Sequence, residues 1–291
     1  MTFIAAETAA CRRLVELALA EDLNLTGDLT SQAVIPPEMR GRACFRCRVS
    51  AVIAGLPAAE MVLNVIDPAL EFRALCDDGA SVVAGTEIAR VTGRVASILS
   101  GERTALNFLQ HLSGIATRTR AYVDLVASTS CQILDTRKTL PGWRYLEKYA
   151  VRCGGGHNHR FGLHDAVLIK DNHLAALHGT SDPVGRAVSE ARQRVAPSVL
   201  VTVEVESIAD LVAALQARPD IVLLDNMPLE AFREAVRLRD DVAPSVLLEA
   251  SGGISLATVR DIAATGVDRI SVGDLTHSAP AIDIGLDYDA L

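Results

Sequence analysis

VLVTVEVESIADLVAALQARPDIVLLDN, residues 199–226, contains two runs of β-branched and aliphatic residues with one helical segment between them. Each run has the length and composition of a buried strand. Parallel strands joined by a helix produce this pattern, because a parallel connection needs a crossover of a dozen or more residues. The stretch therefore predicts a βα unit of a parallel sheet.

Six such runs occur in the second half of the chain, and they alternate with helical segments. They are CQIL (131–134), AVLI (166–169), VLVTVEV (199–205), IVLL (221–224), SVLLEA (245–250) and RISV (269–272). We expect an α/β barrel of the TIM type over residues 113–275. It should be incomplete, because six strands are fewer than the eight of a full barrel.

Polar residues or glycines lie at the end of every predicted strand. Carboxyl ends of parallel strands meet at one rim of a barrel, and such barrels carry out their chemistry there. We therefore expect the functional site at this rim. Its candidate residues are Asp135, Arg137, Lys138, Lys170, Asp171, Asn172, Glu204, Asp225, Asn226, Ser251, Gly252, Gly253 and Gly273.

The first part of the chain indicates a smaller α/β, sandwich-like domain over residues 1–112. Short β-type segments at 44–55, 71–76 and 86–95 are separated by turn signals. The tail 276–291 is expected to pack on this domain.

The connection between the two domains, residues 96–128, has the apolar spacing of helices. Ser100-Gly101 and Ser113-Gly114 are expected to interrupt it, since glycine is unfavourable inside a helix. The stretch therefore predicts two or three helices.

Composition limits the partners and the location. The 291 residues carry a formal net charge of −8, so nucleic acid or an anionic membrane, which need a broad basic face, are not expected partners. The N-terminus lacks the pattern of a signal peptide, and no apolar run approaches the ~18 residues of a membrane span. Six cysteines without a secretory signal are typical of free thiols in a reducing compartment, so we expect a cytoplasmic protein.

Positive charge gathers locally in this acidic chain. Residues 135–173 contain seven Lys or Arg against four Asp or Glu. Arg144 and Lys148, four residues apart, are expected on a solvated helix face. Arg137, Lys138, Arg160 and Lys170 lie at strand ends or in a glycine-flanked loop. Guanidinium groups pair with carboxylates and ammonium groups bind phosphates, so these four predict a ligand that bears both groups.

Other readings of the same region are weaker. CGGGHNHR (153–160) lacks the strand, helix and Lys-Ser/Thr of a nucleotide-binding P-loop. Five histidines lie between His157 and His178, but they have no zinc-binding spacing. The glycine-rich turns in 249–254 and 266–273 follow successive strands and favour a phosphate site.

Long stretches of the sequence resemble the quinolinate phosphoribosyltransferase family, which is type II among phosphoribosyltransferases. The resemblance is carried by residues 134–173, by VEVES (203–207), VLLDNM (222–227) and LEASGGI (248–254), and by 266–287. It implies decarboxylating transfer of phosphoribosyl from phosphoribosyl pyrophosphate to quinolinate, in de novo NAD biosynthesis. It also implies Mg²⁺ and a homodimer or higher homo-oligomer with sites shared between subunits.

The resemblance further implies a role for each site residue. The quinolinate carboxylates would be surrounded by Arg103, Arg137, His159, Arg160 and Lys170. Lys138 would contact the pyrophosphate, and Glu204 and Asp225 the ribose hydroxyls and the Mg²⁺-bound pyrophosphate. The 5′-phosphate would be held by Ser251, Gly252, Gly253, Gly273 and His277. Lys138, Lys170, Glu204 and Asp225 are the expected catalytic residues.

Three alternatives stay open at this stage. Lys170 could be the Schiff-base lysine of a barrel lyase, which would need a desolvated amine. Residues 79–94 have the glycine-spaced strands of a carrier domain, but no lysine lies between 49 and 100 to hold a prosthetic group. A related transferase acting on another pyridine or acidic ring is the closest competitor.

Overall fold

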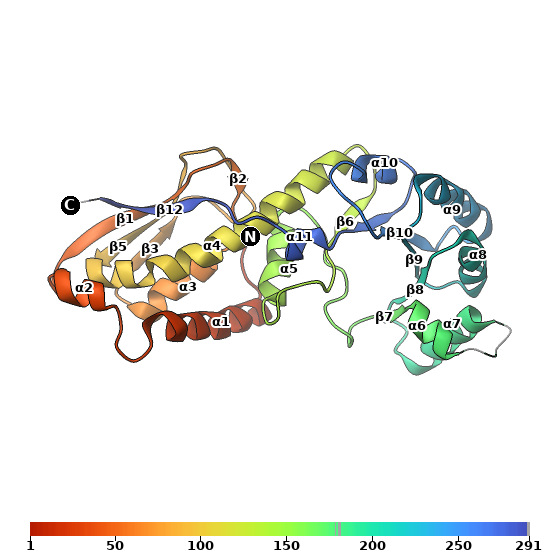
Figure 1. The fold of residues 1–291 in the computed structure, drawn as a ribbon, viewed down its shortest axis with the longest axis horizontal. Helices are drawn as coiled ribbons and strands as arrows, with labels where there is room; N and C mark the ends of the chain where they lie inside the picture. The colour runs from red at the N-terminus through yellow and green to blue at the C-terminus, as the bar shows by residue number, and fades with distance from the viewer. Residues whose placement is uncertain (178, 180–181, 290–291) are drawn as a thin grey trace. The chain divides into compact units, whose positions relative to one another are not determined.

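The computed structural model describes residues 1–177, 179 and 182–289, which fall into two compact units (Figure 1). The first unit comprises 1–120, 138–155 and 274–291, and the second comprises 121–137 and 156–273. The chain therefore enters the second unit, returns to the first for one segment, and ends in the first.

The first unit is built on an antiparallel sheet of four strands in the order β12-β1-β5-β3. The last strand along the chain pairs with the first, so the tail completes this sheet (Figure 1). A second, two-stranded sheet pairs β2 with β4. The bounds are β1 Arg40–Cys47, β2 Ala51–Val52, β3 Glu71–Ala74, β4 Ser81–Val82, β5 Glu87–Arg94 and β12 Ile284–Asp289.

The helices of the first unit bury apolar faces on one another and on the sheets. Leu56, Ala58, Ala59, Val62 and Leu63 of α3 are almost fully buried, and α1 contacts both α3 and α5. The bounds are α1 Ala5–Leu23, α2 Leu29–Val34, α3 Leu56–Ile66, α4 Val95–Val126, α5 Arg144–Cys153 and α11 Asp274–His277, with the last residues of α4 in the second unit.

The prediction of two or three helices over residues 96–128 is wrong, because α4 is a single helix of 32 residues. Its glycines serve close packing. A Cβ on Gly114 would lie 2.2 Å from the carbonyl oxygen of Pro280, and a Cβ on Gly101 would lie 3.0 Å from a methyl group of Leu63. Ser113 is fully buried and its Oγ exchanges hydrogen bonds with the main chain of Ala54.

The prediction of a solvated face on α5 is wrong for Lys148, which is buried. Its neighbour Glu147 is also fully buried, with Oε1 3.0 Å from Nε2 of His111 and Oε2 accepting from the main-chain N–H of Leu140. Spacing in the sequence could not reveal this burial, because the covering residues come from distant segments.

The second unit contains a parallel sheet of six strands in the order β6-β11-β10-β9-β8-β7. All six predicted strands are present. The first strand pairs with the last, as in a barrel, but β6 and β7 do not pair with each other, so the barrel is open between them. The bounds are β6 Gln132–Leu134, β7 Val167–Ile169, β8 Val201–Val205, β9 Ile221–Asp225, β10 Leu247–Ser251 and β11 Arg269–Ser271.

The segment that contains His157 occupies the open side of β6. His157 forms a parallel bridge with Leu134, its N–H donates to the carbonyl of Ile133, and its carbonyl accepts from the N–H of Asp135. The HNHR sequence therefore runs beside β6 where a full barrel would have its next strand.

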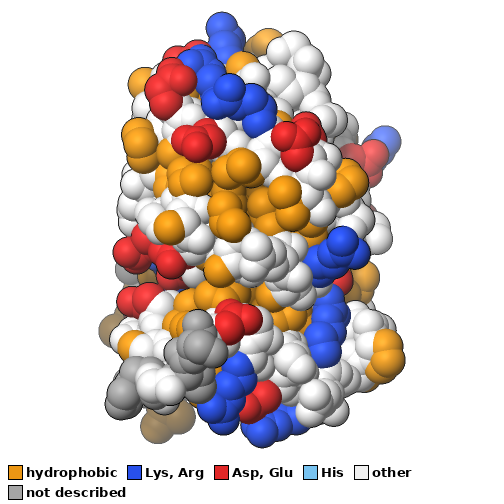
Figure 2. Space-filling model, turned by 90° about the vertical axis from the view of Figure 1, so that its right-hand side faces the viewer, with side chains coloured by type: hydrophobic (Ala, Val, Ile, Leu, Met, Phe, Trp, Pro, Cys, Tyr) orange, Lys and Arg blue, Asp and Glu red, His pale blue; other side chains and the backbone are white. Residues whose placement is uncertain are grey.

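Helices connect the strands of this sheet, as the parallel order requires. Figure 2 shows the face of the second unit where α7, α8 and α9 lie: hydrophobic side chains form a band, and basic and acidic side chains are interspersed above and below it. Among the described residues of this face, basic side chains are therefore mixed with acidic ones. The bounds are α6 Asp171–Ala176, α7 Pro183–Arg194, α8 Ile208–Ala217, α9 Leu229–Val242 and α10 Val259–Ala263.

Among the described residues, no helix is long and apolar enough to cross a membrane. All six cysteines are free thiols, as expected.

The packing of α4 predicts opposite effects for two glycine substitutions. Gly114→Ala should lower the free energy of unfolding, because overpacking against main chain costs about 1–3 kcal/mol and alanine regains only about 1 kcal/mol of helix propensity. Gly101→Ala should be neutral or stabilising, since its methyl group would be tight only against the end of the Leu63 side chain and would make ordinary contacts with Ile66 and Val62. Urea unfolding midpoints measure both, and equal gains at the two positions would contradict this explanation.

Candidate active site

The alternation of side chains along each strand places three of the candidate residues, Glu204, Asp225 and Ser251, on one face of the six-stranded sheet. Directly paired residues of parallel strands point to the same side, and the pairs include Ser251 with Asp225 and Glu249 with Leu223. Glu204 is likewise paired with Leu223. We call the face that carries Glu204, Asp225 and Ser251 the site face.

Lys170 and Glu204 form an ion pair on the site face. Lys170 follows β7, and its Nζ lies 2.7 Å from Oε2 of Glu204 on β8. The side chain of Lys170 is 46% exposed and that of Glu204 10%. An accessible ammonium is thus held in place by a mostly buried carboxylate, and it can reorient toward an anionic ligand.

Asp225 ends β9 and is followed by a tight turn. Its Oδ2 accepts a hydrogen bond from the side chain of Asn226 at 2.7 Å, and Asn226 has a left-handed φ of 54°. The main-chain N–H of Asn226 donates to the carbonyl of Ser251, which joins the ends of β9 and β10. The turn therefore fixes the Asp225 carboxylate beside the glycines that follow Ser251.

Gly252 and Gly253 follow β10 with positive φ values of 85° and 61°. A Cβ on Gly252 would lie 2.2 Å from Oδ1 of Asn226, whereas a Cβ on Gly253 would meet nothing within 4 Å. A side chain at position 252 would collide with Asn226, so this position requires glycine. Position 253 faces open space at the end of the strand. Main-chain N–H groups in such a turn can approach a phosphate closely.

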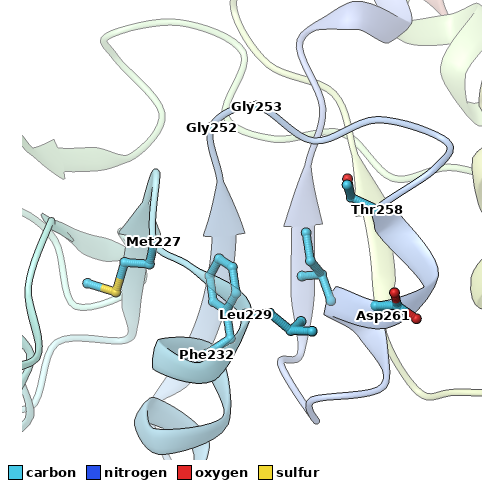
Figure 3. Close-up of a pocket in the computed structure, with 8 residues that line it drawn as sticks. Met227, Leu229, Phe232, Gly252, Gly253, Thr258 and Asp261 are labelled. Atoms are coloured by element: carbon cyan, nitrogen blue, oxygen red, sulfur yellow. The ribbon is translucent and has the colours of Figure 1, made fainter.

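A pocket of about 230 Å³ lies beside this turn (Figure 3). In Figure 3 the two glycines form its upper edge, Met227, Leu229 and Phe232 come from the side of α9, and Thr258 and Asp261 from the side of α10. Its walls combine the apolar side chains of Met227, Leu229, Phe232 and Ile262 with the polar side chains of Thr258 and Asp261 and the two glycines of the turn.

Arg137 and Arg160 repel each other within the second unit. Burial and the positive charge of Arg137 lower the pKa of the Arg160 guanidinium, while the carboxylate of Asp165 acts in the opposite direction. Nη1 of Arg160 donates to the carbonyl of Ala166 at 3.1 Å. Two guanidinium groups held near each other in a partly buried place favour an anion with more than one negative charge.

Asp135 anchors the HNHR segment, and it is fully buried. Its Oδ1 accepts from the main-chain N–H of His159 at 2.8 Å, and its Oδ2 accepts from the side-chain amide of Asn158 at 2.7 Å. The ring of His159 lies toward Glu249, with Nε2 3.2 Å from Oε1. Sequence reasoning placed Asp135 at the rim but missed Glu249, because nothing in a strand sequence shows which face will be sealed from solvent.

Three candidate residues belong to the first unit. Arg103 is exposed on α4, and its charge acts on Glu102, whose pKa is nevertheless raised by burial. Lys138 is exposed, and its carbonyl accepts from Oγ1 of Thr276 at 2.7 Å. His277 ends α11, and its Nδ1 lies 2.6 Å from Oγ of Ser278. Gly273, by contrast, belongs to the second unit.

Within the described residues, no three His, Cys, Asp or Glu side chains converge on a point where they could hold a metal ion. Glu204 and Asp225, on adjacent strands, are two hard oxygen donors of the kind that Mg²⁺ accepts. Any metal held between them would need further ligands from water or from a phosphate-bearing substrate.

The two glycines of the β10 turn predict unequal losses of stability. Alanine at a left-handed position costs about 1–2 kcal/mol at either residue, but only Gly252→Ala also clashes with Asn226, which adds about 1–3 kcal/mol. Gly252→Ala should therefore lower the unfolding midpoint in urea more than Gly253→Ala. A larger loss in Gly253→Ala would show that the turn is held by something other than the contact of Gly252 with Asn226.

Two domains of one known family match this chain. Residues 28–113 match the family described as quinolinate phosphoribosyl transferase, N-terminal domain, and residues 115–287 match its C-terminal domain. A Mycobacterium leprae protein named nicotinate-nucleotide pyrophosphorylase (carboxylating) is 46% identical over 283 residues, which are 97% of this chain and 98% of that protein.

Solved structures agree with this match. The nicotinate-nucleotide pyrophosphorylase of Francisella tularensis has a TM-score of 0.89 at 40% identity, covering 97% of this chain and 96% of that one. NadC from Streptococcus pyogenes has a TM-score of 0.91 at 37% identity, covering 99% and 100%. Matches of both domains, over nearly the whole of each chain, show that this chain belongs to the quinolinate phosphoribosyltransferase family.

Proposed function

We propose that this protein transfers the phosphoribosyl group of phosphoribosyl pyrophosphate to quinolinate, with release of CO₂ and pyrophosphate, and so forms nicotinate mononucleotide. The observation that carries the proposal is that two guanidinium groups, those of Arg137 and Arg160, lie close enough for the charge of one to lower the pKa of the other. Quinolinate has two adjacent carboxylates, and a pair of guanidinium groups can bind them through paired hydrogen bonds. Binding would relieve the repulsion.

The rest of the quinolinate site follows from the same charge argument. Lys170 adds a positive charge that Glu204 partly offsets, and the exposed Arg103 would add another. Together they would stabilise a dianion close to the polyanionic second substrate, which is unfavourable without fixed cations. His159 would be a further ligand of the quinolinate carboxylates.

Phosphoribosyl pyrophosphate would lie along the ends of β8 to β11. The turn of Ser251, Gly252 and Gly253, with Gly273 and His277, would hold the 5′-phosphate, and Lys138 would contact the pyrophosphate. Glu204 and Asp225 would hold the ribose hydroxyls, together with Mg²⁺ that arrives on the pyrophosphate. The metal would neutralise the charge of the leaving group.

The reaction consists of two bond exchanges. The pyridine nitrogen forms a bond to the ribose anomeric carbon as the bond from that carbon to pyrophosphate breaks. The carboxylates of Glu204 and Asp225 would stabilise the positive charge that develops on the ribose. The bond from ring carbon 2 to its carboxylate then breaks, CO₂ leaves, and the electron pair stays beside the positive nitrogen until carbon 2 takes a proton.

The structure gives less support to the two alternative enzymes, a Schiff-base lyase and a transferase acting on another ring. A Schiff-base lysine must be a desolvated amine, whereas Lys170 is nearly half exposed and ion-paired with Glu204. A transferase acting on another pyridine ring needs fewer cations if that ring has one carboxylate.

The six free thiols support the proposed cytoplasmic location.

The proposal is tested by incubating the protein with quinolinate, phosphoribosyl pyrophosphate and Mg²⁺ and measuring CO₂ and nicotinate mononucleotide. Nicotinate is tested in parallel. We expect product from quinolinate and none from nicotinate. Turnover of nicotinate without CO₂ release would contradict the proposal.

Lysine substitutions of the two arginines should separate charge from geometry. Arg137→Lys and Arg160→Lys keep the charge but lose the paired hydrogen bonds, and each should reduce kcat/KM for quinolinate by the equivalent of about 1.5–3 kcal/mol. Arg233→Lys is the matched control, because Arg233 lies on α9 in an exposed pair with Glu230. Equal losses at all three positions would mean that the site is only a general electrostatic patch.

The proposed homodimer has sites shared between subunits, with Arg103 acting on the partner's quinolinate site. Arg103→Ala and Arg160→Ala should each be nearly inactive. After mixing and subunit exchange, half the dimers are mixed and half of their sites are intact, so activity should recover to about a quarter of the wild-type value. No recovery despite demonstrated exchange would place Arg103 in the site of its own subunit or outside any site.

A further inference from the structure

Lys138 lies in an irregular segment between β6 and α5, and two buried side chains of the first unit hold the main chain of this segment. Oε2 of Glu147 accepts a hydrogen bond from the main-chain N–H of Leu140 at 3.2 Å. Oγ1 of Thr276 donates to the main-chain carbonyl of Lys138 at 2.7 Å. Glu147 is fully buried and Thr276 is 3% exposed, whereas Lys138 itself is exposed.

Glu147 does not act as an ordinary helix cap. A capping glutamate is the third residue of its helix and accepts the N–H of the residue just before the helix. Glu147 is the fourth residue of α5, and its carboxylate reaches past Trp143 to the N–H of Leu140, seven residues earlier. The bond therefore holds the segment that follows Lys138 and not the first turn of α5.

The second oxygen of Glu147 is engaged as well. Oε1 lies 3.0 Å from Nε2 of His111 on α4. A carboxylate is costly to remove from water unless hydrogen bonds compensate for it, and here each oxygen has a partner. The carboxylate is in this way fixed between α4 and the segment of Lys138.

Aromatic packing fixes the far end of the segment. The Trp143 ring stacks on Phe108 with centroids 4.9 Å apart and meets His111 edge-on at 5.2 Å. The N–H of Trp143 donates to the carbonyl of Leu140 at 3.1 Å, across a turn in which Gly142 has a positive φ of 84°. The segment therefore ends in a tight turn that is packed on α4.

Lys138 and His277 are the residues of the first unit that would contact phosphoribosyl pyrophosphate, at the pyrophosphate and at the 5′-phosphate. Thr276 directly precedes His277 in α11, so its hydrogen bond to the carbonyl of Lys138 joins the two residues. A lysine ammonium ends a flexible chain of four carbons, so a fixed main chain limits where it can lie. Such fixing reduces the entropy that is lost on binding.

We infer that Glu147 and Thr276 are positioning residues, which hold the main chain of Lys138 so that its ammonium meets the pyrophosphate. The inference rests on the proposed function. The role requires a hydrogen-bond acceptor at position 147 and a hydroxyl at position 276, and it requires no charge. Arg137 and Arg160, which would bind quinolinate, belong to the second unit, so quinolinate binding should stay unchanged.

The first test compares two substitutions of Glu147. Glu147→Met removes the acceptor with little change in volume, and kcat/KM for phosphoribosyl pyrophosphate at saturating quinolinate should fall about 3- to 10-fold, as for one lost hydrogen bond. Glu147→Gln keeps an acceptor and should stay close to the wild type. The dissociation constant of quinolinate, measured by titration calorimetry, should change in neither. Equal losses of kcat/KM in both variants would overturn the inference.

Glu7 provides the matched control. It is buried in the same unit, its Oε2 accepts from the N–H of Ile4 at 2.9 Å, and its Oε1 pairs with Arg152 near the end of α5 at 2.6 Å. Glu7→Met should lower the unfolding midpoint in urea, as Glu147→Met should, but leave kcat/KM unchanged. The same loss of kcat/KM in Glu7→Met would mean that destabilisation of the unit explains the effect.

The second test uses Thr276 and a combination with Lys138. Thr276→Val loses the hydroxyl and should reduce kcat/KM for phosphoribosyl pyrophosphate, whereas Thr276→Ser keeps the hydroxyl and should not. In a Lys138→Ala background, neither Glu147→Met nor Thr276→Val should cause a further loss, because both act through Lys138. Additive losses in this background would contradict the inference.

Hydrogen exchange tests the geometry without any substrate. The N–H of Leu140 should exchange faster in Glu147→Met than in the wild type, and equal rates overturn the inference whatever the activity of the protein. If exchange behaves as expected but the wild type does not turn over quinolinate and phosphoribosyl pyrophosphate, the proposed function fails and the positioning role fails with it. If the wild type turns over both but Glu147→Met and Thr276→Val keep its kcat/KM, the inference alone is overturned.

Discussion

The repulsion between Arg137 and Arg160 is the interaction on which the rest of the site depends. Two guanidinium groups come together only if the fold fixes both of them. Arg137 follows β6, and Arg160 belongs to the segment that runs beside β6 on the open side of the barrel. The opening of the barrel therefore makes room for the HNHR segment, because a seventh strand pairing with β6 would occupy its place.

Buried carboxylates position the cations around this pair. Asp135 fixes the main chain of His159, Glu249 lies against the His159 ring and Arg269, and Glu204 holds Lys170. Asp135 and Glu249 are fully buried and Glu204 is mostly buried, whereas Lys170 is nearly half exposed, so the acidic groups form the support and the ammonium of Lys170 remains accessible. A chain with a net charge of −8 can in this way present a local cationic site.

The sequence predicted the parts of the fold that depend on local composition. All six parallel strands could be recognised because short runs of aliphatic residues, separated by helices, have few other solutions. The single helix α4 could not be recognised in this way. Its glycines, Gly101 and Gly114, look like helix breaks in the sequence, but they pack closely against Leu63 and Pro280, which are far away in the chain. Lys148 was misplaced for the same reason. Spacing could not reveal that the ring of His159 lies 3.2 Å from the buried carboxylate of Glu249 either, because Glu249 comes from a distant strand.

The central claim is that the protein recognises two adjacent carboxylates on one ring. Titration calorimetry of quinolinate and of nicotinate, each without the second substrate, tests it most directly. The extra carboxylate should make quinolinate bind about 10- to 150-fold more tightly, the equivalent of one charged hydrogen-bonded contact, and salt should reduce the difference. Equal affinities for the two rings would contradict the account.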